Sequence, residues 1–404
     1  MASVLPSPAR RAEAGRKRKT FRGSSRTGGS SSARPDMRVA VVVGTRPEAI
    51  KMAPVVKALK AAPRIKVVVW SSGQHREMLD QVFDLFDLSA DRELGVMTSD
   101  QGLSAAFSAV LQGTARLIAE DRPDWLLVHG DTSTAGAAAI AAFHGKVRIG
   151  HVEAGLRSHR MDAPWPEEFN RRLVDMVADL HFAPTKSARQ NLLTEGVADR
   201  SILVTGNTVI DALLATRARL EASPARCEAL DAAGPALDPD LPIVLVTGHR
   251  RENFGDGFRQ ICEALARLDD TGQVQIVYPV HLNPNVQEPV KALLSHRSRV
   301  HLIAPVDYEA FVRLMMRARV VLTDSGGVQE EAPSFGKPVL VMREVTERPE
   351  AVEAGAARLV GSSPDAIVGG VMAALGSGWP RISRNPYGDG QAARRIVEGL
   401  TACP

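Results

Sequence analysis

Short apolar runs rich in valine and isoleucine alternate with longer segments of helical periodicity through most of this 404-residue chain. Runs such as 39–43 and 125–128 show little alternation between apolar and polar residues, which is typical of parallel strands covered by helices on both faces. The alternation stops at 223–242, a stretch with four prolines that we interpret as a loop-rich interlude, and then begins again. The sequence therefore predicts the α/β class, with two Rossmann-like doubly wound domains facing a cleft.

The individual elements can be placed from the same pattern. We expect strands at 39–43, 66–70, 125–128, 148–151, 180–183 and 202–204, and again at 243–247, 274–278, 300–303, 320–323, 339–342 and 358–360. We expect helices at 47–60, 77–86, 102–120, 135–143, 257–268, 286–294, 308–317 and 327–335.

Positive charge is concentrated at the amino terminus. Residues 1–36 carry nine Arg or Lys side chains and only two acids, so the net charge of +4 for the whole chain leaves the remainder mildly acidic. This remainder favours neither a nucleic-acid partner nor a membrane, because it lacks a basic surface and an apolar run of about 20 residues. We expect 1–36 to be a disordered basic extension, or translation to start at Met37, with a polyanion-binding arm as the alternative.

The three cysteines, Cys227, Cys262 and Cys403, are far apart and show no CxxC spacing. A disulfide framework or a zinc site is therefore not expected, and a reducing, cytoplasmic location fits. We expect Cys262 in the core, on the apolar side of a helix. No HExxH motif indicates a metal and no GxGxxG motif indicates NAD, so no cofactor is expected.

Two turns that follow predicted strands have the composition of phosphate-binding sites. In 44–48 (GTRPE), a glycine allows a tight turn before a helix start, and Arg46 and Lys51 supply positive charge. In 324–331 (DSGGVQEE), Ser325 is expected to cap a helix, and the glycines allow a phosphate to approach the backbone. Glu330 and Glu331 would support the helix dipole or accept ribose hydroxyl groups. The alternative for 44–48 is an ordinary strand–helix turn with surface cations.

Acidic side chains follow further strands. Asp131, Glu153 and Glu167 are expected at strand ends or in the loops that follow, where they would share the ligand cleft. Their mutual repulsion should raise some of their pKa values, which suits proton transfer near neutral pH. His249 directly follows the first strand of the second domain and is the strongest histidine candidate. The alternative is that the acids cap helices or pair with arginines; His75, His151 and His281 are weaker candidates.

The chain resembles the bacterial non-hydrolysing UDP-N-acetylglucosamine 2-epimerases. The resemblance runs from Met37 to the carboxyl terminus and is specific because it depends on nine motifs in order. The motifs are 44–48 (GTRPE), 73–79 (GQHREML), 129–132 (HGDT), 151–157 (HVEAGLR), 164–168 (PWPEE), 206–211 (GNTVID), 247–252 (TGHRRE), 324–331 (DSGGVQEE) and 346–350 (TERPE).

This resemblance implies a GT-B-like fold and a reaction. It places an N-terminal Rossmann-like domain at 37–204, a C-terminal one that binds UDP at 205–385, and a helix within 386–404 that packs back on the first domain. The implied reaction is reversible inversion at C2 of UDP-GlcNAc to give UDP-ManNAc without NAD, through elimination of UDP and a 2-acetamidoglucal intermediate.

The resemblance also implies roles for individual residues. The catalytic positions are Asp131, Glu153, Glu167 and His249. The UDP-binding positions are Arg46, Lys51, Phe311, Ser325, Gly326, Gly327, Glu331 and Arg348. Val306 stands where some members have glutamine, so that contact requires its backbone. Gln74, His75 and Arg76 are implied to bind a second, activating UDP-GlcNAc.

The family further implies a homodimer that supplies ManNAc units for bacterial surface polysaccharide. Three other functions remain open at this point: a hydrolysing UDP-GlcNAc 2-epimerase that releases ManNAc and UDP, a GT-B glycosyltransferase with an acceptor site, and a non-catalytic sugar-nucleotide sensor. The segment 73–79 favours the non-hydrolysing enzyme.

Overall fold

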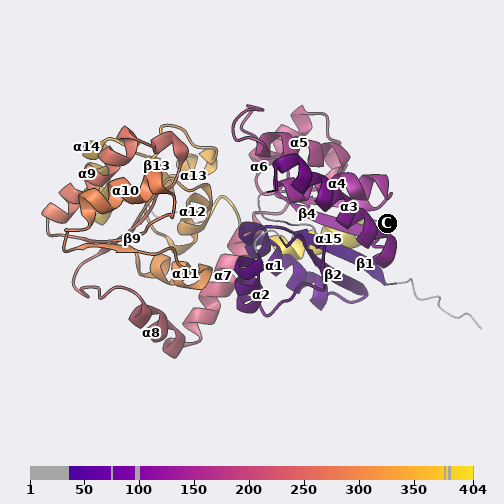
Figure 1. Ribbon diagram of the computed structural model, residues 1–404, viewed down its shortest axis with the longest axis horizontal. Coiled ribbons are helices and arrows are strands. Elements are labelled where there is room, and N and C mark those ends of the chain that lie inside the picture. Colours follow the sequence, from indigo (N-terminus) through magenta and orange to yellow (C-terminus); the bar gives the residue numbers. More distant parts are fainter. Residues whose placement is uncertain (1–35, 74–75, 96–100, 377–378, 381–383, 404) are drawn as a thin grey trace, which may run out of the picture. The chain divides into compact units, whose positions relative to one another are not determined.

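The computed structural model describes residues 36–73, 76–95, 101–376, 379–380 and 384–403. These residues form two parallel sheets, each accompanied by helices (Figure 1). The prediction of two Rossmann-like doubly wound domains is confirmed by this architecture. The predicted basic extension, 1–36, lies outside the described residues except for Asp36.

The first sheet has seven parallel strands in the order β3-β2-β1-β4-β5-β6-β7. The strand order reverses between β1 and β4, so the carboxyl ends of these two strands open a crevice suited to a ligand. The strands are β1 Met37–Val43, β2 Ile65–Ser71, β3 Arg92–Glu93, β4 Trp125–His129, β5 Arg148–Val152, β6 Leu180–Ala183 and β7 Ile202–Val204. The helices are α1 Arg46–Ala61, α2 Arg76–Leu85, α3 Leu103–Asp121, α4 Ser133–His144, α5 Glu167–Val177 and α6 Lys186–Thr194, with the 3₁₀ turn η1 Asp199–Ser201.

The second sheet repeats this topology in six parallel strands, β10-β9-β8-β11-β12-β13. Its order reverses between β8 and β11, which places a second crevice after those strands. The strands are β8 Ile243–Thr247, β9 Gln275–Pro279, β10 Val300–Ile303, β11 Val320–Thr323, β12 Val339–Val341 and β13 Ala357–Leu359. The helices are α9 Asp256–Asp270, α10 Pro284–Leu294, α11 Tyr308–Arg317, α12 Gly326–Glu331, α13 Pro349–Glu353 and α14 Pro364–Leu375, with the 3₁₀ turns η2 Arg251–Asn253 and η3 Ala332–Phe335.

Two helices connect elements of both halves. Helix α7, Thr208–Glu221, packs against α1 of the first half and against α11 and α12 of the second. Helix α15, Ala392–Ala402, packs against α1 and α7. The buried carboxylate of Asp211 on α7 accepts hydrogen bonds from the first two backbone N–H groups of α15, at 3.2 Å from Ala392 and 2.8 Å from Ala393. This carboxylate therefore caps α15 from inside the fold.

The interpretation of 223–242 as a loop-rich interlude was wrong in part. Helix α8 occupies Pro224–Ala233, with its proline in the first turn, where the missing N–H costs no hydrogen bond. The expected helix at 327–335 was also too long, because it divides into α12 and the 3₁₀ turn η3, which contains Pro333. Helices α5, α6, α7, α13 and α14 and the short strand β3 were not predicted individually.

The strands are buried on both faces, which explains their lack of polar alternation. Val39, Ala40 and Val41 of β1 have no solvent exposure. Cys262 on α9 is fully buried, so its prediction as a core residue is confirmed. Among the described residues, no helix combines the length and the apolar composition that crossing a bilayer requires.

Candidate active site

The turn after β1 is held by a buried glutamate. Glu48 accepts hydrogen bonds from the backbone N–H groups of Gly44 (3.0 Å) and Thr45 (2.7 Å), and from the hydroxyl group of Thr132 (2.6 Å), which follows β4. Burial raises the pKa of Glu48 despite these donors. Gly44 is required for space rather than for an unusual φ, since a Cβ atom there would lie 2.3 Å from Oγ1 of Thr134. Glu48 thus joins the two turns that border the first crevice.

Lys51 and Glu153 form a buried ion pair beside this turn. Nζ of Lys51 lies 2.5 Å from Oε2 of Glu153, and the two side chains are 14% and 9% exposed. Glu153 has φ of 68°, a left-handed conformation that a residue other than glycine adopts only when its surroundings impose it. Burial opposes ionisation of Glu153, but Lys51, His129 and Arg348 outweigh it and lower the pKa of Glu153.

This result corrects one expectation. Repulsion among the predicted acids was expected to raise some of their pKa values, but the neighbours of Glu153 include Lys51 and Arg348, and its pKa is lowered. The pKa of Lys51 is correspondingly raised, because Glu153 and Glu330 outweigh the effect of burial. Burial lowers the pKa of His129 to about 3, so this ring, 3.8 Å from Glu153, is neutral near pH 7.

Asn207 links this ion pair to the second half of the chain. Its Nδ2 atom donates to Oε2 of Glu153 (2.8 Å) and to Oε2 of Glu330 (2.9 Å). Oε1 of Glu330 accepts in turn from Nε of Arg348. We name Lys51, Glu153, Asn207, Glu330 and Arg348 the bridging cluster. This cluster connects Glu153, which was predicted to be catalytic, to Arg348, which was predicted to bind UDP. Asn207 and Glu330 make the connection, and the sequence did not predict this linking role.

Arg348 extends from the bridging cluster toward the start of α12. A Cβ atom on Gly326 would lie 3.2 Å from Oε1 of Glu347 and 3.7 Å from NH2 of both Arg348 and Arg250, so the glycine leaves room between these charged groups and the helix start. Burial opposes the charge of Arg348, but Glu330, Glu153 and Glu347 raise its pKa further. Backbone N–H groups and a guanidinium group at this place suit an anionic group such as a diphosphate.

Two expectations for this segment were wrong. The hydroxyl group of Ser325 makes no capping hydrogen bond to α12; instead, the backbone N–H group of Ser325 donates to Oγ1 of Thr323 (2.9 Å). Glu330 and Glu331 are at the end of this short helix and are buried, so support of its dipole does not explain them. Their hydrogen bonds to Arg348, Asn207 and Tyr308 explain why these two carboxylates are buried here.

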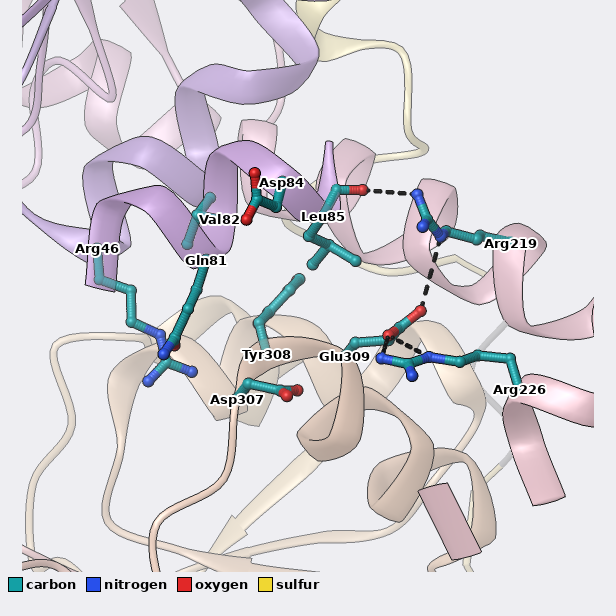
Figure 2. Close-up of a pocket in the computed structure, with 10 residues that line it drawn as sticks. All are labelled: Arg46, Gln81, Val82, Asp84, Leu85, Arg219, Arg226, Asp307, Tyr308 and Glu309. Carbon is teal, nitrogen blue, oxygen red and sulfur yellow. Dashed lines mark hydrogen bonds and ion pairs between the residues drawn. The ribbon is translucent and has the colours of Figure 1, made fainter. Parts of the chain in front are cut away.

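Tyr308 contacts Glu331 and lines a cavity together with Arg46 of the first half. Oε1 of Glu331 accepts from the hydroxyl group of Tyr308 (2.7 Å), and burial raises the pKa of Glu331 to about 7. Tyr308 and Arg46 line a cavity of about 280 Å³ between α1, α2, α8 and α11 (Figure 2). NH2 of Arg46 donates to the carbonyl oxygen of Val306 (3.2 Å), so the backbone of Val306 makes the contact at this position. Phe311 is partly buried against the core.

Asp131 and Glu167 border the first crevice with Glu153. Asp131 follows β4, and its carboxylate forms an ion pair with Arg171 on α5. This matches the alternative prediction, in which the acid pairs with an arginine. Glu167 begins α5, and its Oε2 atom is buried without a hydrogen-bond partner among the described residues. A buried oxygen of this kind costs free energy unless a ligand group satisfies it.

His249 lies in the second half, in the loop after β8. Its ring stacks on that of His281, with centroids 5.5 Å apart, and its Nδ1 atom lies 3.4 Å from Oδ1 of Asp324. Within the described residues, none of its hydrogen bonds, ion pairs or ring contacts involves Asp131, Glu153 or Glu167. The three acids therefore belong to the first half of the chain, after β4, after β5 and at the start of α5, whereas His249 belongs to the second half, after β8.

The remaining candidates divide into structural and undescribed residues. His151 is fully buried, with Nδ1 2.5 Å from Asp175 and Nε2 2.8 Å from the carbonyl oxygen of Gly130, so it is structural. Gln74 and His75 lie outside the described residues, and Arg76 is described only as the first residue of α2. The described residues include no cluster of His, Cys, Asp and Glu suited to a metal ion.

Comparison with known proteins identifies relatives over nearly the whole chain. The model of a family described as UDP-N-acetylglucosamine 2-epimerase matches residues 57–401. The UDP-N-acetylglucosamine 2-epimerase of Escherichia coli K12 is 54% identical over 369 residues, which are 90% of this chain and 98% of that protein. The crystal structure of UDP-GlcNAc 2-epimerase from Neisseria meningitidis bound to UDP-GlcNAc has a TM-score of 0.84 and 43% identity, covering 91% of this chain and all of that one. A glycosyltransferase from Rickettsia africae, at 15% identity and a TM-score of 0.58, shares only the fold.

Proposed function

This chain belongs to the UDP-N-acetylglucosamine 2-epimerase family, and we propose that it interconverts UDP-GlcNAc and UDP-ManNAc reversibly without hydrolysing either. The bridging cluster is the observation that carries the proposal. It places a carboxylate kept ionised, Glu153, within one hydrogen-bonded network with Arg348, which faces the open start of α12. Such a network can hold the diphosphate of a nucleotide sugar next to a group that acts on the sugar.

The proposed reaction is an elimination followed by an addition. A base removes the proton from C2 while the C1–O bond to UDP breaks, which gives 2-acetamidoglucal and UDP. Both stay bound; a proton then returns to the other face of C2, and UDP re-forms its bond to C1. Cations and helix starts on the diphosphate stabilise the charge of the leaving UDP. The diphosphate and uridine would be held by Arg46, Lys51, Phe311, Ser325, Gly326, Gly327, Glu331 and Arg348.

Proton removal on one face and delivery on the other require at least two acid/base groups. Asp131, Glu153, Glu167 and His249 are the proposed ones. The lowered pKa of Glu153 keeps it an anion before the reaction, the form that can accept a proton or stabilise positive charge that develops on the sugar. The unpaired Oε2 atom of Glu167 suits a direct contact with the substrate.

Reaction in D₂O tests this mechanism. UDP-GlcNAc incubated with the protein, without added NAD or metal, should yield UDP-ManNAc that carries deuterium at C2, as followed by NMR. The same spectra distinguish the alternatives, because a hydrolysing enzyme would accumulate free ManNAc and UDP, and a glycosyltransferase would require an acceptor. UDP-ManNAc that retains the original proton at C2 would exclude the elimination.

Arg46→Ala should weaken the binding of UDP about tenfold or more, because a hydrogen bond to a charged group contributes about 1.5–3 kcal/mol. Calorimetric titration with UDP measures the effect. Arg189→Ala is the matched control, since Arg189 is an exposed arginine paired with Asp199 on α6 and should leave UDP affinity unchanged. Equal affinity in both variants would make Arg46 a structural residue that only contacts Val306.

We further propose allosteric activation by a second UDP-GlcNAc at Gln74, His75 and Arg76. A ligand can shift a conformational equilibrium only by its different affinities for the two states. UDP-ManNAc alone should therefore react slowly until some UDP-GlcNAc is present. Reverse-direction assays with rigorously purified UDP-ManNAc should show a lag that added UDP-GlcNAc removes, whereas full activity from time zero would contradict the second site.

A homodimer is the proposed assembly. Large apolar side chains are exposed on two helices that pack on one another, Phe143 (59%) on α4 and Met176 (80%) on α5. Exposed large apolar side chains favour association when they form a patch. We propose that the enzyme acts in the cytoplasm, consistent with its unpaired cysteines, and supplies ManNAc units for a bacterial surface polysaccharide.

A further inference from the structure

Asp324 is a fully buried carboxylate that follows β11, next to β8 in the second sheet. Its Oδ2 atom accepts hydrogen bonds from the backbone N–H groups of His249 (2.9 Å) and Arg250 (2.8 Å). A weaker contact to the same atom comes from Nδ2 of Asn253, at 3.4 Å. These bonds fix the backbone of the loop that carries His249, and they use only one of the two carboxylate oxygens.

The second oxygen of Asp324 faces the His249 ring. Oδ1 lies 3.4 Å from Nδ1 of His249 and has no hydrogen-bond partner among the described residues. The ring of His281, inclined by 19°, stacks on the His249 ring and restricts its rotation. The His249 side chain remains 40% exposed, so the ring is anchored on its Nδ1 side while part of it stays accessible.

We infer that Asp324 is a positioning residue that holds His249 with a proton on Nδ1 and with Nε2 free to exchange a proton with the substrate. This inference depends on the proposed role of His249 in the reaction. When Nε2 accepts a proton, the ring becomes a cation whose Nδ1–H group faces the carboxylate, and the added proton leaves again from Nε2. The proton does not pass on to Asp324. A carboxylate that fixes the tautomer of a histidine and stabilises its charged form acts in the same way in hydrolytic triads.

The charges around His249 make the carboxylate necessary. Burial is the largest effect and lowers the pKa of His249, and the neighbouring Arg250 and His281 lower it further. Asp324 is the group that opposes them. Without this carboxylate, the ring would bind a proton only at still lower pH and would transfer protons less well near pH 7.

Asp324→Asn tests the inference because the change is nearly isosteric. The amide oxygen can still accept from the two backbone N–H groups, so the amide NH₂ group then faces Nδ1 of His249 and forces the proton onto Nε2. We expect kcat to fall by roughly 10²-fold or more. The limb of the kcat/KM profile that depends on His249 should move to lower pH, and the affinity for UDP should stay unchanged.

Asp211→Asn is the matched control. Asp211 is also a buried carboxylate that accepts two backbone N–H groups, but it caps α15 and contacts no histidine. It should share any loss of thermal stability with Asp324→Asn while keeping the wild-type pH profile. A pH profile and kcat for Asp324→Asn that match those of Asp211→Asn would overturn the inference.

A measurement on the wild-type protein covers the case in which Asp324→Asn does not fold. Ring ¹⁵N chemical shifts of labelled histidine, assigned with His249→Gln, report the tautomer of the neutral ring. A proton on Nδ1 supports the inference and a proton on Nε2 overturns it. This readout needs no turnover, so a wild-type protein that fails to convert UDP-GlcNAc would refute the proposed function while the tautomer still decides the role of Asp324.

Discussion

Glu153→Gln should lower kcat for UDP-GlcNAc epimerisation by roughly 10²-fold or more, the usual effect of losing a positioned catalytic group. Oε2 of Glu153 accepts from Lys51 (2.5 Å) and Asn207 (2.8 Å), and the positive charges of Lys51 and Arg348 stabilise its negative charge. An amide keeps the size of the side chain but removes the charge. We therefore expect the loss mainly in kcat, measured from initial rates of UDP-ManNAc formation.

Glu168→Gln is the control for this variant. Glu168 is a fully buried carboxylate near the start of α5 that accepts from the backbone N–H group of Ser158 (2.9 Å) and from Arg172 (3.0 Å), which is a structural role. Its loss should lower the melting temperature and leave kcat within a few-fold of the wild type. Near-normal turnover by Glu153→Gln would remove Glu153 from the mechanism, whereas equal losses in both variants would point to a general effect of buried charge.

The strands could be predicted well because local pattern determines them. Five of the strands, β6, β7, β8, β10 and β11, have the same bounds in the structure as in the prediction. A parallel strand covered on both faces needs a continuous apolar run, and such a run is visible in the sequence itself. The carboxyl ends of the strands could then be inferred, and with them the neighbourhood of Asp131 and Glu153.

The bridging cluster could not be predicted in the same way. Asn207 reads as a helix N-cap, and Oδ1 of Asn207 does accept from the backbone N–H group of Val209 at the start of α7 (3.1 Å). That bond turns Nδ2 toward Glu153 and Glu330, which are 54 and 123 residues away in sequence. Contacts at such separations follow from the packing of α1, α11 and α12 on α7, which no local pattern reports.

The same reason explains why the lowered pKa of Glu153 was not expected. From the sequence, the charged groups expected near Glu153 are acids, since Asp131 and Glu167 follow neighbouring elements. In the structure, its closest charged partner is Lys51. This residue lies on α1, the helix that follows β1, and β1 is the neighbour of β4 in the sheet. The sign of a pKa shift depends on which charge lies within a few ångströms, and only the fold determines that.

Arg348→Met should destabilise the protein by about 3–5 kcal/mol, the usual cost of leaving a buried ion without its partner. Glu330 is 1% exposed, and Arg348 provides its ion pair. Burial already raises the pKa of Glu330, and removal of Arg348 takes away a group that lowers it. An acid with a raised folded-state pKa binds more protons when folded, so the stability loss should grow as pH rises above the unfolded-state value. Urea unfolding at several pH values measures this.

The double variant Arg348→Met/Glu330→Gln separates stability from binding. It removes the buried charge along with its partner, so most of the lost stability should return, because an ion pair replaced as a whole costs little. The affinity for UDP should not return, since the guanidinium group that faces the start of α12 is still missing. Arg189→Ala is the comparison for a pair at the surface: Arg189 lies 2.6 Å from Asp199 and the two side chains are 36% and 63% exposed, so its loss should cost far less and leave UDP affinity intact. Recovery of UDP affinity in the double variant would show that Arg348 serves only to neutralise Glu330, and the diphosphate site would then have to be sought among the other cations.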